Sequence, residues 1–324
     1  MIEMTDICKS FRVARRGAGM SAAVKALFRR EYEEVRALDR VSFRVGNGEM
    51  VGYIGPNGAG KSTTIKVMSG ILTPDSGRCV IDGRVPWENR TAHVSHIGVV
   101  FGQRSQLWWD VPVIDSFELL RDIYRVPQAQ YVRTRDELIE ILALSEIVRT
   151  PVRQLSLGQR MRCEIAAALL HGPDILFLDE PTIGLDAVSK RAVRDFILRQ
   201  NRAHGTTVIL TTHDMQDIEA LTSRILLIGK GRILLDGQLD ALREQYLPQK
   251  TLTVSYRGTL GALPEGARLL SSQEGHAVIE ADTTRLEPGA LIAALSSEVE
   301  LTDLAVGGGS TEELVLRLYR DYSI

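Results

Sequence analysis

Short apolar runs recur along the chain and alternate with stretches of helical periodicity. The apolar runs have the length of buried strands: Met50–Ile54, Ile97–Val100, Ile175–Leu178, Val208–Thr211 and Ile225–Ile228. The helical stretches lie between several of them: Lys61–Ser69, Gln159–Leu170, Ala187–Arg202 and Met215–Leu221. Strands that alternate with helices predict an α/β fold, in which helices cover both faces of a mainly parallel sheet.

Two regions depart from this rhythm. Residues 112–170 read as mostly helical, which predicts a separate helical lobe. After residue 245 the alternation stops, and two strand-like segments, Thr251–Tyr256 and Ala277–Ala281, precede an amphipathic helix at Thr311–Tyr319. We therefore expect a main α/β domain over residues 1–245 and a small C-terminal α+β domain over residues 246–324.

A basic insertion occupies about residues 14–36. From Arg12 to Arg30 there are six basic residues and no acid. Apolar side chains recur there at helical spacing, namely Val24, Leu27, Phe28, Tyr32 and Val35. The pattern predicts a basic amphipathic helix, which suits a membrane interface or a partner protein. A helix packed on its own domain is an equally good interpretation.

Composition narrows the class of protein. Hydrophobic residues make up 44% and charged residues 25%, with a formal net charge of −2. This balance is that of an ordinary globular protein, and it provides no overall charge to attract nucleic acid or anionic lipid. The sequence has no signal peptide and no apolar run long enough to cross a membrane. Its three cysteines are widely spaced, so we expect a protein of the reducing cytosol without disulfides.

Residues 55–62, GPNGAGKS, match the phosphate-binding pattern GxxxxGK followed by Ser or Thr. An apolar strand leads into the pattern and a helix leads out, so backbone N–H groups and the helix N-terminus would face phosphate oxygens. Lys61 would reach the β- and γ-phosphates, and the Ser62 hydroxyl would ligate Mg²⁺. A chance glycine-rich turn is the alternative. The predicted nucleotide contacts are Gly55, Pro56, Asn57, Gly58, Ala59, Gly60, Lys61, Ser62 and Thr63.

Two acids, Asp179 and Glu180, end the apolar run that begins at Ile175. The carboxyl edge of a parallel sheet is where ligands bind, so both acids are expected near the phosphate loop. Neighbouring residues of a strand point to opposite sides, which gives the two acids different tasks. Asp179 suits Mg²⁺, and Glu180 suits a base that deprotonates the attacking water. A helix cap or a solvated turn is the alternative.

Two further polar residues follow predicted strands. His213 comes after the strand that ends near Thr212, and its imidazole could donate a hydrogen bond to the γ-phosphate. Gln103 comes after Ile97–Val100 and could contact Mg²⁺ or the attacking water. Either residue alone would more often be structural, and only the neighbouring motifs favour a catalytic role.

The stretch Gln154–Met161, QLSLGQRM, resembles the LSGGQ signature of the ABC ATPase family. It lies about twenty residues before the Asp179–Glu180 pair, as in that family, and it departs from the family by Leu157 in place of a glycine. Other family landmarks follow in order. Gln103 matches the Q-loop, Gly184-Leu185-Asp186 match the D-loop, His213 matches the switch histidine, and Phe11 matches the aromatic residue that stacks on adenine. The resemblance covers residues 1–240 and implies an ATPase with a parallel core sheet, an antiparallel β subdomain and a helical lobe.

The resemblance implies that ATP is bound between two copies of the chain. Ser156, Gly158 and Gln159 lie where a helix starts, so hydroxyl, N–H groups and helix dipole form a second anion site. In the family this signature contacts the nucleotide held by the other copy, and the resemblance places Asp186 of the D-loop among the residues that bind the nucleotide. A homodimer is therefore expected.

Further residues narrow the resemblance to the ATP-binding subunits of ABC-2-type exporters, in particular a multidrug or viologen-exporter-like branch. They are the basic insertion, the stretch Phe101–Trp109 and the ending Leu314–Tyr319. In the family the region after the Q-loop receives a helix of the membrane permease, so Trp108 and Trp109 would line that groove or pack in the core. The resemblance implies a position at the cytoplasmic face of the membrane. A non-transport ABC ATPase acting on nucleic acid or the ribosome is the alternative, but the neutral charge and the single ATPase domain disfavour a nucleic-acid partner.

Overall fold

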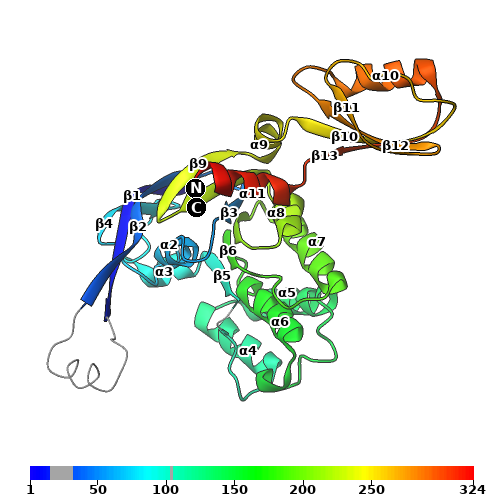
Figure 1. Ribbon diagram of the computed structural model, residues 1–324. Coiled ribbons are helices and arrows are strands. Elements are labelled where there is room, and N and C mark those ends of the chain that lie inside the picture. Colours follow the sequence, from blue (N-terminus) through cyan, green and yellow to red (C-terminus); the bar gives the residue numbers. More distant parts are fainter. Residues whose placement is uncertain (15–31, 103–104) are drawn as a thin grey trace, which may run out of the picture. The chain divides into compact units, whose positions relative to one another are not determined.

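The computed structural model describes residues 1–14, 32–102 and 105–324. The chain divides into two compact units, residues 1–236 together with Ile324 and residues 237–323 (Figure 1). The sequence pattern puts this boundary near residue 245. The units separate earlier because α9 (Leu239–Tyr246) packs against α11 (Thr311–Asp321), with the Arg243 guanidinium 2.6 Å from the Thr311 hydroxyl.

A six-stranded sheet forms the centre of the first unit, in the order β5-β6-β7-β3-β8-β9. Its strands are β3 (Met50–Ile54), β5 (Ile97–Phe101), β6 (Ile175–Asp179), β7 (Thr207–Thr211), β8 (Arg224–Gly229) and β9 (Arg232–Gln238). The pairs β3–β7, β3–β8, β5–β6 and β6–β7 are parallel, so the carboxyl ends of these strands lie at one edge. The five strands expected from the apolar runs are confirmed. These runs are apolar along their length because both faces of the sheet are covered.

Four helices of the first unit also agree with the sequence pattern. They are α2 (Lys61–Met68), α6 (Leu157–Leu169), α7 (Ala187–His204) and α8 (Met215–Leu221). The start of α6 differs, since Gly158 is a residue of its first turn rather than of the preceding loop. Because Ser156 caps the helix, α6 begins at Leu157, two residues earlier in the sequence than predicted. A short helix, α3 (Arg90–Val94), precedes β5.

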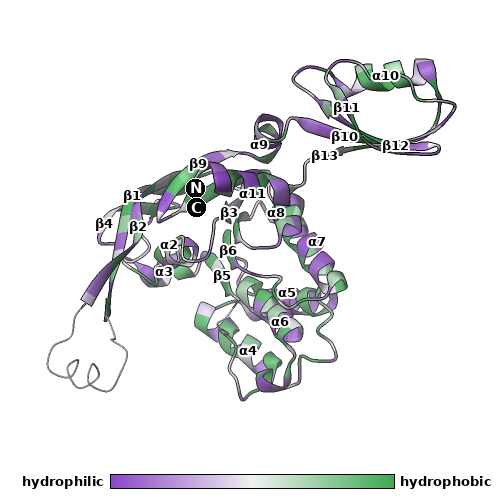
Figure 2. Cartoon of the chain, in the orientation of Figure 1, coloured by the Kyte–Doolittle hydropathy of each residue, from purple (hydrophilic) through white to green (hydrophobic). Residues whose placement is uncertain are grey.

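A second sheet of the first unit is antiparallel, in the order β2-β1-β4. It consists of β1 (Ile2–Ala14), β2 (Tyr32–Val45) and β4 (Ser76–Ile81). Its buried side chains, such as Ile2 and Val41, share one core with Ile65 of α2 and Tyr53 of β3. The hydropathy colouring in Figure 2 shows the apolar residues gathered on these strands and helices. This packing holds the helix that follows the phosphate loop between the two sheets.

The structure corrects one prediction for the basic insertion. Tyr32 and Val35 were assigned to an amphipathic helix, yet both lie in β2, where they pair with Ala14 and Phe11 of β1. Pairing with β1 over the whole length of the strand outweighs the local helical spacing of these residues. Residues 15–31, which contain the rest of the predicted helix, lie outside the described residues.

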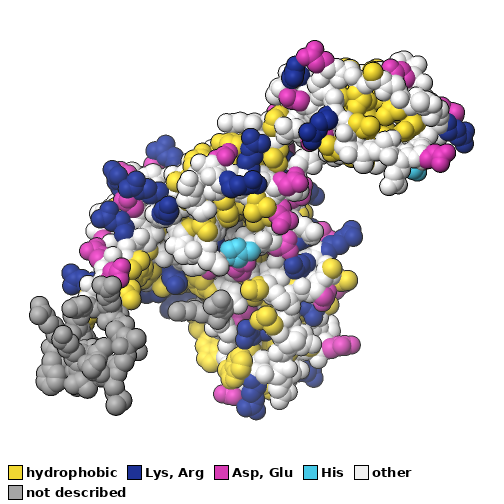
Figure 3. All heavy atoms as spheres, viewed as in Figure 1, with side chains coloured by type: hydrophobic (Ala, Val, Ile, Leu, Met, Phe, Trp, Pro, Cys, Tyr) yellow, Lys and Arg dark blue, Asp and Glu magenta, His cyan; other side chains and the backbone are white. Residues whose placement is uncertain are grey.

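Residues 112–170 contain helices α4 (Val113–Tyr124), α5 (Gln128–Ile141) and α6, together with the 3₁₀ turn Val152–Gln154. Phe117, Leu138 and Leu144 are buried within this helical lobe. Other large apolar side chains are exposed, and Figure 3 shows hydrophobic surface around α4. They are Trp108 (41% exposed), Trp109 (52%), Leu119 (41%) and Ile123 (56%). Both tryptophans therefore lie on the surface, which rules out the interpretation that they fill the core.

The second unit contains a four-stranded antiparallel sheet in the order β11-β12-β10-β13. Its strands are β10 (Gln249–Arg257), β11 (Ala267–Gln273), β12 (His276–Asp282) and β13 (Glu300–Gly308). Helix α10 (Pro288–Glu298) covers one face through Leu291 and Leu295. The strands β11 and β13 and helix α10 were not predicted. Across the described parts of the chain, no helix is long and apolar enough to span a bilayer.

Candidate functional site

The phosphate loop connects the end of β3 to the start of α2. Gly60 has φ 114°, and a Cβ built on it would lie 2.7 Å from the Ala37 carbonyl oxygen, so only glycine fits there. Lys61, the first residue of α2, is 8% exposed. Its ammonium donates to the carbonyl oxygens of Gly55 (2.5 Å) and Pro56 (3.1 Å). The loop thus curls around the ammonium and presents the free N–H groups of the first helical turn beside it.

A cavity of about 620 Å³ lies over this loop. Nine of its lining residues were predicted from the sequence: Asn57, Gly58, Gly60, Lys61, Ser62, Thr63, Asp179, Glu180 and His213. They come from β3–α2, from the end of β6 and from the end of β7. The parallel sheet therefore brings the phosphate loop, the two acids and the histidine to one edge, as the sequence pattern predicted.

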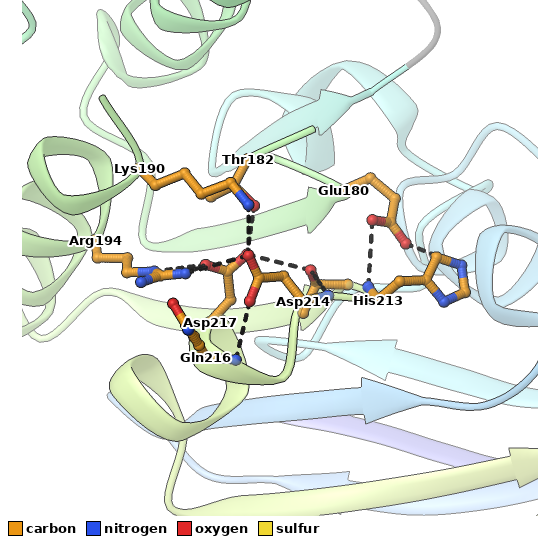
Figure 4. Close-up of polar contacts among 9 residues, drawn as sticks. Glu180, Thr182, Lys190, Arg194, His213, Asp214, Gln216 and Asp217 are labelled. Atoms are coloured by element: carbon orange, nitrogen blue, oxygen red, sulfur yellow. Dashed lines mark hydrogen bonds and ion pairs between the residues drawn. The ribbon is translucent and has the colours of Figure 1, made fainter. Parts of the chain in front are cut away.

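The two acids have different partners. Asp179 is the last residue of β6, and its Oδ1 accepts a hydrogen bond from the Thr211 hydroxyl at 2.5 Å. Glu180 has φ 58°, a left-handed conformation that is uncommon for a residue with a side chain. Figure 4 shows its carboxylate facing His213, whose Nε2 lies 3.3 Å from Oε1 and whose backbone N–H donates to Oε2 at 3.3 Å. The strained turn directs Glu180 away from the partner of Asp179 and toward the histidine.

Burial changes the acidity of two groups that face the cavity. It raises the pKa of the Glu180 carboxyl above its ordinary value, although the neighbouring His213 opposes this. Burial also lowers the pKa of the Lys61 ammonium, while Glu180 and Asp179 raise it. A carboxyl with a raised pKa is a stronger base, which suits proton abstraction from water.

We predict that the rate of ATP hydrolysis falls as the pH decreases. The midpoint of this fall should lie above 4.5, the ordinary pKa of glutamate. The reason is that protonated Glu180 cannot accept a proton from water. Because His213 lowers the Glu180 pKa, His213→Ala should move this acid limb to higher pH, in addition to lowering the rate. The measurement is the pH dependence of kcat for both proteins, with His204→Ala, an exposed histidine of α7, as control. Identical acid limbs would contradict the assignment of Glu180 as the base.

A buried ionic network fixes the turns that follow β6 and β7 (Figure 4). At its centre is Asp217, which is fully buried on α8. Its carboxylate accepts hydrogen bonds from the Arg194 guanidinium (2.5 Å), the Thr212 hydroxyl (3.2 Å) and the Thr182 hydroxyl. Thr182 lies two residues after Glu180, and Thr212 lies directly before His213. One carboxylate thus holds both turns, and so fixes the base relative to the histidine.

The signature residues do not line this cavity. Ser156 and Gln159 form a capping box at the start of α6, in which the Gln159 N–H donates to the Ser156 hydroxyl oxygen (3.2 Å) and the Ser156 N–H donates to the Gln159 side-chain oxygen (2.9 Å). Leu157, the departure from the family pattern, packs over Gly184, where an added Cβ would meet the leucine side chain at 2.3 Å. The start of α6 is therefore capped as the sequence predicts, and its residues are separate from those that line the cavity.

Other predicted residues do not line the cavity. Asp186 caps α7, with the Ser189 N–H donating to its carboxylate at 2.8 Å, which lowers the Asp186 pKa. Phe11 lies on β1 opposite Val35, two residues from Ala37, which does line the cavity. Gly55, Pro56 and Ala59 shape the loop from behind. Gln103 lies outside the described residues.

Five lining residues were not predicted: Ala37, Lys66, Phe101, Gly102 and Ile183. Lys66 follows Ser62 by one helical turn, so the helical spacing could have revealed that it shares the face of α2 that borders the cavity. Gly102 allows the end of β5 to approach β6 closely, since an added Cβ would meet the Asp179 carbonyl oxygen at 3.1 Å. Ala37 and Ile183 carry no sequence signal of this kind.

The residues around the cavity fit a magnesium ion bound together with a nucleotide. In the described part of the chain there is no group of three or more His, Cys, Asp or Glu side chains that could hold a metal by themselves. The Ser62 hydroxyl and the Asp179 carboxylate do provide hard oxygen ligands at the cavity wall. Mg²⁺ commonly binds through one or two such ligands plus phosphate oxygens and water.

Comparison with known proteins relates the chain to ATP-binding subunits of transporters. The family model described as ABC transporter matches residues 38–183. Daunorubicin resistance ATP-binding protein DrrA3 of Streptomyces coeruleorubidus is 32% identical over 90% of this chain and 94% of that protein. Methionine import ATP-binding protein MetN of Geobacillus kaustophilus is 36% identical over 68% of this chain and 64% of that protein. The dimeric, post-hydrolysis structure of the ATP-binding cassette MJ0796 with ADP and Pi has a TM-score of 0.62 at 26% identity, covering 74% of this chain and 98% of that one.

Proposed function

We propose that this chain, which belongs to the family of ABC transporter ATP-binding proteins and hydrolyses ATP, powers an ABC-2-type exporter of drugs, lipids or other amphipathic cargo. The observation that carries the proposal is a cavity lined by the phosphate loop, both acids and the histidine, which the signature residues at the start of α6 do not line. Such an arrangement suits an enzyme that closes on ATP only when a second copy supplies its signature.

Hydrolysis would use the residues at the carboxyl edge of the sheet. Lys61 and the N–H groups at the start of α2 would bind the β- and γ-phosphates, and Ser62 and Asp179 would hold Mg²⁺. The ion would neutralise charge that develops on the phosphates. Glu180 accepts the proton of the attacking water, and His213, within 3.3 Å of Glu180, positions that carboxylate and hydrogen-bonds the γ-phosphate. Phe11 would complete the site next to the adenine.

Two copies would enclose two nucleotides in a head-to-tail dimer. The first turn of α6 carries free N–H groups at Leu157 and Gly158, and the helix dipole favours an anion there. A twofold axis that places this turn over the phosphate loop of the other copy gives two identical closed sites. Asp186 lies just beyond Gly184, which contacts the signature residue Leu157. The D-loop would therefore lie at the same interface.

Export is favoured over import by analogy with the drug-resistance relative, which matches 90% of this chain and so includes most of the second unit. A subunit that shares its C-terminal unit with a drug-resistance protein is better explained as part of an exporter. The chain would then work at the cytoplasmic face of the membrane, held there by its permease, with no nucleic-acid partner.

Trp108 and Trp109 provide the surface on which the permease would dock. Exposed tryptophans are uncommon on a monomer's surface and are typical anchors of protein interfaces. We predict that the double variant Trp108→Ser/Trp109→Ser no longer co-purifies with a polytopic membrane protein from detergent-solubilised native membranes, while its ATP affinity is unchanged. The matched control is Leu269→Ser/Leu270→Ser, two exposed leucines of the second unit. Co-purification of nucleic acid or ribosomes in place of a membrane protein would instead support the non-transport alternative.

A further inference from the structure

Residues of the stretch 105–110 contact the helix that begins at the signature. We call Ser105–Asp110 the tryptophan segment. At its C-terminal end, the Trp109 carbonyl accepts from the Arg153 N–H (3.0 Å), and the Arg153 guanidinium donates to Asp110 (3.1 Å). The guanidinium of Arg160 on α6 lies 6.0 Å from the centre of the Trp109 ring. The segment is therefore attached to residues on both sides of the signature.

The N-terminal end of the segment is held by one buried acidic residue of α6. Glu164 on α6 is only 3% exposed. Its carboxylate accepts hydrogen bonds from the Ser105 hydroxyl and from the Gln106 N–H (3.1 Å). The Gln106 side-chain amide in turn donates to the Glu164 carbonyl oxygen at 3.1 Å. Three hydrogen bonds thus join two residues of the segment to one residue of the signature helix.

These contacts are strong enough to move the segment with the helix. A carboxylate excluded from water forms stronger hydrogen bonds than a neutral group, and losing its partners would leave an uncompensated buried charge. Burial raises the pKa of the Glu164 carboxyl, whereas the bonds from Ser105, Gln106 and Leu107 and the charge of Arg160 oppose that change. Eight residues, about 12 Å of continuous helix, separate Glu164 from Ser156. Because α6 is one continuous helix, a displacement of the signature also displaces Glu164.

We propose that Glu164 is a positioning residue that joins the tryptophan segment to the signature helix, so that engagement of the signature by nucleotide shifts Trp108 and Trp109. The inference rests on the proposed function, because the signature meets nucleotide only in the dimer. Since the coupling is reciprocal, a permease helix seated on the two tryptophans would also bias the signature toward or away from that nucleotide.

Tryptophan fluorescence of the full chain tests the proposal. The chain has three tryptophans, and Trp87→Phe leaves the pair in the segment as the only indole reporters. In a Trp87→Phe/Glu180→Gln background, addition of ATP should form the dimer, measured by light scattering, and shift the emission of Trp108 and Trp109. Adding Glu164→Gln, which keeps the side-chain size but removes the charge and one acceptor, should abolish the shift while the dimer still forms. Glu140→Gln, at an exposed acid of α5 in the same lobe, should leave the shift unchanged.

A second variant covers the case in which Glu164→Gln fails to fold. Ser105→Ala removes one donor to the same carboxylate from the other side of the contact, and it should reduce the emission shift without affecting dimer formation. The proposal is overturned if the parent dimer shows no shift, or if folded Glu164→Gln or Ser105→Ala dimers shift as the parent does. Absence of an ATP-dependent dimer in the parent is a different result, which refutes the proposed function and this inference with it.

Discussion

Glu180→Gln should reduce ATP turnover by about three orders of magnitude, because a positioned general base contributes roughly 10²–10⁴ to a rate. The amide keeps the shape of the side chain and can still accept the N–H of His213, which now lies 3.3 Å from Oε2. It cannot take a proton from water. Since Lys61 and the phosphate loop are untouched, the variant should bind ATP with ordinary affinity and accumulate as an ATP-dependent dimer.

The measurements for this variant are steady-state phosphate release, equilibrium binding of ATP and light scattering with and without ATP. Glu146→Gln, the same substitution at an exposed acid of the helical lobe, serves as the matched control and should hydrolyse ATP normally. Turnover at the wild-type rate by Glu180→Gln would show that another group activates the water. Loss of ATP binding would instead show that Glu180 holds the nucleotide rather than the reacting water.

Two inactive variants should restore activity to each other when mixed. Lys61→Ala removes the ammonium of the phosphate loop but leaves the signature intact. Ser156→Asp keeps a good helix cap at the start of α6 and places a negative charge where the γ-phosphate of the other copy would bind. Each variant alone should lose nearly all ATPase activity. In a mixture, half of the dimers contain both chains, and each of these has one intact composite site.

The expected activity of an equal mixture is about a quarter of the wild-type value if the two sites of a dimer act independently. The control is Ser310→Asp, which makes the same change at the cap of α11, where Ser310 and Glu313 form an equivalent capping box. That variant should be fully active. Full activity of Ser156→Asp by itself, at a concentration where the chain is monomeric, would refute the composite site, because one copy would then suffice for hydrolysis.

The predictable part of the site consists of short motifs. A phosphate loop requires a strand, glycines and a helix start in one continuous stretch, so residues 55–63 specify their own conformation. Asp179, Glu180 and His213 could be assigned because they end apolar runs, and the carboxyl ends of parallel strands meet at one edge. The signature was located by its resemblance to the LSGGQ motif of the family, and the helical pattern from Gln159 onward indicated that it stands at the start of a helix. Lys66 was missed although its spacing from Ser62 would have revealed it.

Contacts between distant residues could not be predicted in this way. The helical spacing of Tyr32 and Val35 was misleading, because pairing with β1 decides their conformation. The left-handed turn at Glu180 depends on the fit of neighbouring strands, and no local pattern marks it. Glu164 resembles an ordinary helical glutamate in the sequence, and its role follows only from burial against Ser105 and Gln106, nearly sixty residues away.

The sequence by itself therefore determined the candidate residues of the site: the phosphate loop, the acid pair and the histidine, together with the parallel sheet that brings them to one edge. These follow from local spacing and periodicity, and the signature follows from its resemblance to the family motif. Only the tertiary structure decided that the signature lies outside the nucleotide cavity, that Asp217 fixes the turns of Glu180 and His213, and that Glu164 joins the tryptophan segment to the signature helix. The physical reason is that burial and the pairing of buried charges depend on which surfaces meet in the fold, and neighbours along the chain do not specify that.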